Sequence, residues 1–114
     1  MDQIVDKIAA LGVPGLVLFV VMSVSGWAGA AAITTSLALL GGPFGMLGGI
    51  AVLGVLGLFS KGLAEYGFEE IFKASIAKMH ESGKSKTDIE REIGFYPISG
   101  DLKLKIRYYL EQIG

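Results

Sequence analysis

The sequence predicts an all-α protein made of a glycine-rich apolar helical hairpin and a small C-terminal module of three polar helices. The first observation is that residues 8–60 contain no ionisable side chain over 53 positions, and eleven of these residues are glycine. The second is that eight Lys/Arg and nine Asp/Glu follow Lys61, among apolar residues that recur at helical spacing. We therefore expect two units, an apolar one at 1–61 and an amphipathic one at 62–114.

The N-terminal residues 2–11 predict a short amphipathic helix. Ile4, Ile8 and Leu11 fall at helical spacing, and charged residues lie between them. Pro14 lacks a backbone donor but suits the first turn of a new helix, so a second helix is expected to begin there.

Two apolar segments follow, at 14–40 and 44–59. The first has 27 residues, more than the ~20 that a transmembrane helix needs. Paired glycines and a proline separate the segments, and we interpret Gly42 and Pro43 as a turn. The second segment is long enough to span a bilayer only if it extends to about Tyr66. The two would form a hairpin whose flanks lie on one side of a membrane.

Trp27 lies in the middle of the first segment. Tryptophan favours membrane interfaces, but this position also suits core packing or a break near residues 23–29. A break would give three apolar helices, at 14–24, 27–40 and 44–66. Together with Lys61, whose long side chain can reach an interface, and Tyr66, Trp27 is a candidate membrane-interface residue.

The C-terminal unit predicts three amphipathic helices separated by capping signals. The first covers 68–81 and ends near Gly83. Ser85 and Asp88 fit a capping box that opens the second helix, and Ser99 can cap the third. The apolar stripe of the third helix consists of Leu102, Ile106, Tyr109, Leu110 and Ile113. So small a unit is expected to pack on the hairpin or on neighbouring subunits.

Small residues four apart are the main motif of the apolar unit. Residues i and i+4 share a helix face, and small residues let helices approach closely in lipid. We interpret these faces as surfaces for packing within the hairpin and for self-association. The generic alternative is that glycine is common in transmembrane segments and in closely packed soluble bundles. The candidate residues are Gly26, Ala30, Thr34, Gly41, Gly45, Gly48, Gly49, Gly54 and Gly57.

Residue types that carry most enzymatic chemistry are missing or isolated. There is no cysteine, and the single histidine, His80, lies on a charged helix face. No nucleophile with a neighbouring base can be assembled, and the glycines at 41–49 lack the Lys-Ser/Thr of a phosphate loop. The charges of 62–114 nearly balance, which argues against nucleic acid. We expect no enzyme, no catalytic residue, no cofactor, no metal site and no nucleic-acid partner.

Two family resemblances point in the same direction. Gly12-Val13-Pro14, Gly26-Trp27 and the apolar run 36–40, followed by a charged amphipathic helix, resemble circular bacteriocins of the saposin-like kind. That resemblance implies a compact helical peptide that permeabilises membranes, although this chain is longer and has no cationic excess. The stretch 34–50 resembles small glycine-rich hydrophobic proteins of bacterial conflict and programmed-death systems. That resemblance implies a membrane-disrupting effector held by a partner until triggered.

These observations predict a membrane-active, pore-forming protein that oligomerises through its glycine faces. The expected partners are a lipid membrane, further copies of the chain and a regulatory protein that binds 62–114. We expect residence in the inner (cytoplasmic) membrane with 62–114 on the cytoplasmic side, or a soluble form that inserts later. Two alternatives stay open: a soluble or peripheral binding or scaffold module with the apolar stretch as its core, and a passive membrane anchor subunit.

Overall fold

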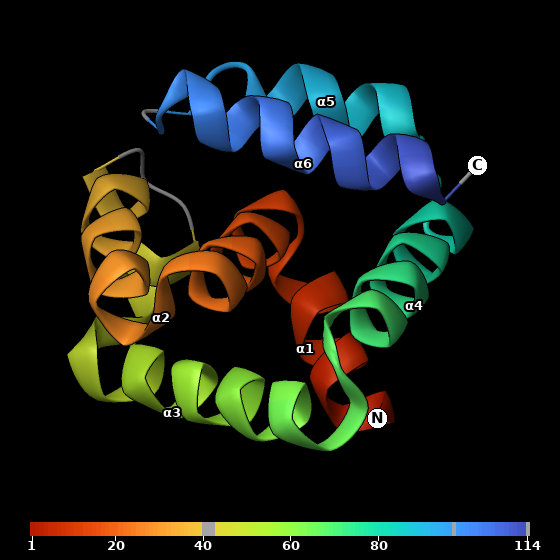
Figure 1. The fold of residues 1–114 in the computed structure, drawn as a ribbon. Helices are drawn as coiled ribbons and strands as arrows, with labels where there is room; N and C mark the ends of the chain where they lie inside the picture. The colour runs from red at the N-terminus through yellow and green to blue at the C-terminus, as the bar shows by residue number, and fades with distance from the viewer. Residues whose placement is uncertain (40–42, 97, 114) are drawn as a thin grey trace.

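Six α-helices make up the described part of this computed structural model (Figure 1). The structure describes the backbone of residues 1–39, 43–96 and 98–113 and the side chains of 1–26, 54–96 and 98–113. The helices are α1 (Asp2–Leu11), α2 (Val13–Leu39), α3 (Pro43–Tyr66), α4 (Phe68–Glu81), α5 (Lys86–Ile93) and α6 (Gly100–Gln112). No strand occurs within these ranges, so the predicted all-α class is confirmed.

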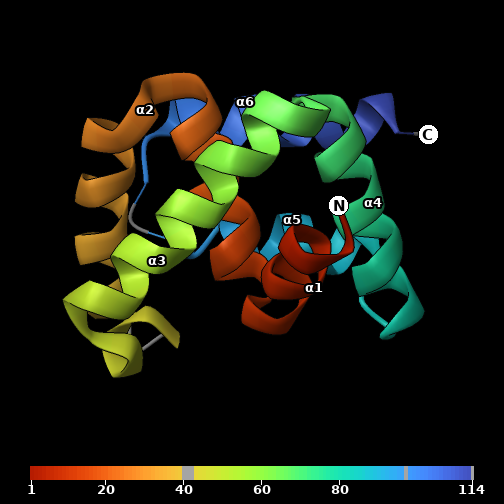
Figure 2. The same cartoon turned by 90° about the horizontal axis from the view of Figure 1, so that it is seen from below.

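The first part of α2 forms the centre of the fold. Every residue from Gly15 to Met22 is buried, a run of more than two helical turns, so this helix is covered on all sides. Figure 1 shows α5 and α6 on one side of it and α3 on the opposite side. Seen from below, α3 crosses α2 while α1 lies beside α4 (Figure 2). A helix that is apolar on all sides needs such a covering, and the amphipathic helices supply it.

Glycines with positive φ make the sharp corners between helical segments. Gly26 has φ 73° and ψ −162° and bends α2 into two parts that run in different directions (Figure 1). This backbone conformation is essentially restricted to glycine. The break expected as an alternative at residues 23–29 is therefore present, and the apolar stretch consists of three helical pieces. Gly12 and Gly67 form the corners before α2 and before α4 in the same way.

Aromatic rings join four helices around Phe19 of α2. Its ring packs edge-on against Phe59 of α3, with centroids 5.6 Å apart, and stacks on Phe68 of α4 at 5.5 Å. Phe68 in turn contacts Tyr109 of α6 at 4.7 Å. Such ring pairs contribute about 0.5–1.5 kcal/mol each beyond the area they bury. The cluster thus connects the central helix to three of its covering helices.

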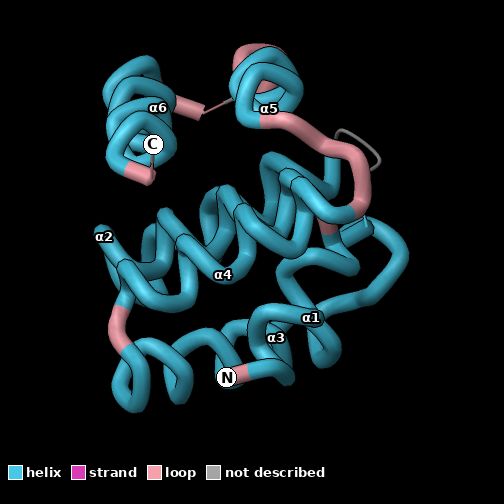
Figure 3. Tube along the Cα trace, turned by 90° about the vertical axis from the view of Figure 1, so that its right-hand side faces the viewer, coloured by secondary structure: helices cyan, strands magenta, loops and turns pink. Residues whose placement is uncertain are grey.

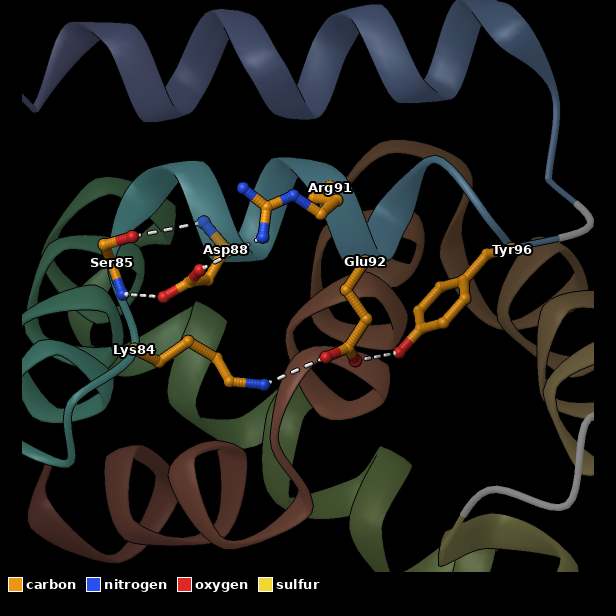
Figure 4. Close-up of polar contacts among 6 residues, drawn as sticks. All are labelled: Lys84, Ser85, Asp88, Arg91, Glu92 and Tyr96. Carbon is orange, nitrogen blue, oxygen red and sulfur yellow. Dashed lines mark hydrogen bonds and ion pairs between the residues drawn. The ribbon is translucent and has the colours of Figure 1, made fainter.

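The C-terminal helices begin at the predicted residues, and α4 also covers the predicted range 68–81. Ser85 accepts a hydrogen bond from the Asp88 backbone N–H and donates its own N–H to the Asp88 carboxylate, which completes the capping box (Figure 4). Ser99 caps α6 through the Leu102 N–H. α5 and α6 run side by side and cover α2 (Figure 3). The residues of α4, α5 and α6 that the fold buries are Ile71, Phe72, Ser75, Ile76, Met79, Ile89, Ile93, Ile106 and Leu110.

The hydrophobic core takes residues from both predicted units. It includes Ile4, Phe19 and Phe59 from the first unit and Ile71 and Ile106 from the second. The C-terminal helices thus pack on the apolar helices of the same chain. The division at residue 61 lies inside α3, and it stays a prediction.

Candidate self-association and membrane-contact site

Gly54 and Gly57 form a bare strip of backbone on the outer face of α3. Both are exposed, and a Cβ atom added at either position would meet none of the described residues within 4 Å. The residues between and after them, Leu56 and Phe59, are 2% and 0% exposed. This part of α3 therefore points Leu56 and Phe59 at the core and these two glycines outward, where another helix can approach closely.

One of the two predicted interface residues on α3, Lys61, continues this outer face. Lys61 lies seven residues after Gly54, which places both on the same helix face, and its side chain is exposed. Tyr66, the last residue of α3, is 39% exposed. Their positions at a membrane interface remain predictions.

Gly26 is placed at the corner of α2. Among the described residues, a Cβ atom there would meet nothing within 4 Å, and its backbone conformation calls for glycine. Its role in helix packing stays a prediction. Pro43 begins α3, and no side-chain environment is described for it. The other candidate residues lie outside the described backbone or outside the described side chains; they are Trp27, Ala30, Thr34, Gly41, Gly42, Gly45, Gly48 and Gly49.

Two glycines that the sequence did not single out make the close contacts of α1. A Cβ atom on Gly15 would lie 2.6 Å from the Leu11 Cβ and 3.2 Å from the Ile8 carbonyl oxygen. A Cβ atom on Gly62 would collide with the Ile4 side chain. The only signal in the sequence is glycine inside a helix, which costs about 1 kcal/mol relative to alanine and so calls for a packing reason.

A small polar cluster closes the turn between α4 and α5. The Lys84 Nζ lies 2.9 Å from the Glu92 Oε1, and the Tyr96 hydroxyl donates to the other oxygen of the same carboxylate (Figure 4). Burial and this hydrogen bond raise the pKa of Tyr96. These contacts tie Lys84, before α5, and Tyr96, after it, to Glu92 of α5.

Within the described ranges, no three His, Cys, Asp or Glu side chains gather into a metal-binding group. His80 is exposed on α4. None of the helices, as far as their residues are described, combines the length and the apolar character needed to cross a membrane. No family model, curated protein or solved structure matches this chain.

Proposed function

We propose that this chain is a membrane-active protein that self-associates through the outer glycine face of α3 and permeabilises a lipid bilayer. The observation that supports it best is the central part of α2. This helix is buried on all sides at Gly15–Met22, inside a stretch of 53 residues without an ionisable group. Such a segment needs an apolar environment, which either its own chain or lipid can provide.

Exchanging the protein core for lipid costs the central helix little. A side chain such as Leu16 or Phe19 gains about 1.5–3 kcal/mol when it leaves water. Lipid tails are as apolar as leucine, so a bilayer preserves that gain. Charged groups at mid-membrane would cost about 2.5–3.5 kcal/mol each, and residues 8–60 contain none.

The cost of insertion falls on the covering helices, which have to separate from α2. The ion pair between α1 and α4, Lys78 with Asp6 at 3.4 Å, joins side chains that are 49% and 60% exposed. Exposed pairs of this kind contribute at most about 1 kcal/mol. The covering helices are therefore held mainly by apolar contacts, for which lipid can compete.

The length of α2 decides whether its bent or its straight form can span a bilayer. From Val13 to the corner at Gly26, α2 covers about 20 Å at 1.5 Å per residue, short of a hydrocarbon core of ~30 Å. The whole of α2 as one straight helix would cover about 40 Å. The proposed function therefore requires α2 to straighten at Gly26 when it inserts.

The test combines dye release from vesicles with measurement of assembly size. Purified protein should release dye, and replacing both Gly54 and Gly57 by leucine should reduce assembly and release together. Both sites have open space around them, so the fold should tolerate the change. Ala10→Leu is the control for added apolar bulk, because it places a leucine at an exposed position of α1 instead of α3. The proposal is wrong if intact protein leaves vesicles sealed.

A second candidate function is a soluble or peripheral helical binding module. The packing of Phe19 against Phe59 and Phe68 favours it, because the central helix already has a complete apolar environment within its own chain. A protein of this kind would remain a monomer at high concentration and would release no dye from vesicles of any composition. The same two measurements therefore separate the two functions.

A further inference from the structure

A cavity of about 360 Å³ lies between α4, the turn that follows it, the start of α5 and the end of α6. Among the described residues, every polar side chain that lines it is basic or histidine, and the remainder of the lining is apolar. The polar group consists of Lys73, His80, Lys84 and Lys86, and the apolar part includes Ile76 and Ile113.

Two of these lysines, Lys73 and Lys86, have no ion-pair partner among the described residues. Lys84 pairs with Glu92 at 2.9 Å. Across residues 1–26, 54–96 and 98–113, neither Lys73 nor Lys86 has a carboxylate within ion-pair distance. Two ammonium groups and His80 thus face one cavity with no anion from the described chain between them. This arrangement suits an anionic group such as phosphate.

A second cavity of about 280 Å³ continues from the first between α4 and α6. The two cavities share Lys73 and Ile113. Aromatic side chains line the second one, namely Phe68, Phe72, Tyr108 and Tyr109, together with the polar Glu69 and Gln112. A basic cavity thus lies next to a ring-lined one.

We propose that these adjoining cavities bind an anionic lipid, with its phosphate at Lys73, Lys86 and His80 and its apolar chain along the rings between α4 and α6. Charge complementarity selects the headgroup, and the aromatic lining selects an amphiphile over a free anion. The choice of a membrane lipid as the ligand rests on the proposed function. The site adds to that function the class of lipid that the protein recognises.

The test uses dodecyl phosphate below its micelle concentration, with full-length protein and no vesicles. It should bind at one molecule per chain. Inorganic phosphate, which lacks the chain, and dodecyltrimethylammonium, which reverses the headgroup charge, should each bind at least tenfold more weakly. Binding of inorganic phosphate as tight as that of dodecyl phosphate would show a simple anion site and overturn the lipid assignment.

Charge reversal locates the site. Replacing Lys73 and Lys86 by glutamate should weaken dodecyl phosphate binding by roughly tenfold, since two attractive contacts with the phosphate become repulsive. Replacing Lys105 and Arg107 by glutamate is the matched control, because it changes net charge equally at exposed residues of α6 that line neither cavity. Equal losses in both variants would overturn the proposal.

Two milder variants keep the test valid if charge reversal harms folding. Lys73→Gln with Lys86→Gln removes the charges without reversing them, and Tyr108→Ser alters the ring-lined cavity at a residue that is 56% exposed. Each should weaken binding while the melting temperature stays unchanged, and unchanged binding in both overturns the proposal. Dye release from zwitterionic vesicles tests the proposed function separately, because it needs no anionic lipid.

Discussion

Replacing Gly26 by alanine should shift the chain from its folded form toward membrane insertion. In the folded chain Gly26 holds φ 73° and ψ −162°, and a Cβ atom there would meet no neighbour. The effect of the substitution therefore comes from the backbone alone, without a steric clash or a lost contact.

The magnitude follows from two terms that act in the same direction. An alanine in this glycine-only region costs about 1–3 kcal/mol in the bent form. In a straight α2, alanine is favoured over glycine by about 1 kcal/mol. Together they shift the balance between bent and straight α2 by about 2–4 kcal/mol, which is about 30- to 700-fold.

Two measurements check this shift. Urea unfolding in buffer should show Gly26→Ala to be less stable by about 1–3 kcal/mol, and partition into vesicles should increase. Gly67→Ala is the matched control, because Gly67 forms a corner with φ 83° between α3 and α4. It should lose similar stability, but straightening there adds the charged α4 to an apolar helix and should not favour insertion. The reasoning fails if Gly26→Ala partitions no better than Gly67→Ala.

Five further substitutions test the packing and the polar contacts. Gly15→Ala should destabilise the fold by about 1–3 kcal/mol through overpacking, whereas Gly57→Ala, in open space, should stabilise it by up to about 1 kcal/mol; urea midpoints compare them. Ser85→Ala should cost about 1 kcal/mol by removing a helix cap. The hydrogen bond from the Ser85 backbone N–H lowers the pKa of Asp88. The stability that the Asp88 carboxylate contributes is therefore present above about pH 4 and lost as the pH falls through the lowered pKa. Asp88→Asn should make the free energy of unfolding depend less on pH in this acid range. Burial and the hydrogen bond to the Glu92 carboxylate raise the pKa of Tyr96. The stability that its hydroxyl contributes is therefore complete below about pH 10 and lost at higher pH. Tyr96→Phe should make the melting temperature fall less steeply as the pH rises, which thermal melts measure.

The C-terminal helices could be predicted because their boundaries depend on local chemistry. Ser85 and Ser99 hydrogen-bond to backbone groups three residues away, so the sequence itself contains both partners of each cap. The corner at Gly26 was predicted only as an alternative. A glycine beside tryptophan in an apolar run is compatible with a continuous helix as well as with a break, and the choice depends on what α2 packs against.

The close contacts of Gly15 and Gly62 could not be predicted because they depend on α1. Gly62 leaves room for Ile4, which lies 58 positions earlier in the sequence. The helical spacing of small residues drew attention instead to Gly54 and Gly57, three residues apart, which are exposed. Regular spacing identifies residues on one helix face, but it does not tell which face the core occupies when almost every residue is apolar.

The lipid site and the buried helix are linked through the helices that they share. Phe68 and Tyr109 line the ring-lined cavity and also contact each other within the aromatic cluster that holds Phe19. A ligand that needs α4 and α6 in this arrangement stabilises it, by an amount that grows with the logarithm of ligand concentration above Kd. Occupied cavities should therefore oppose the separation of these helices from α2. We expect dodecyl phosphate to raise the urea midpoint and to slow dye release, and acceleration of release by the bound amphiphile would contradict this linkage.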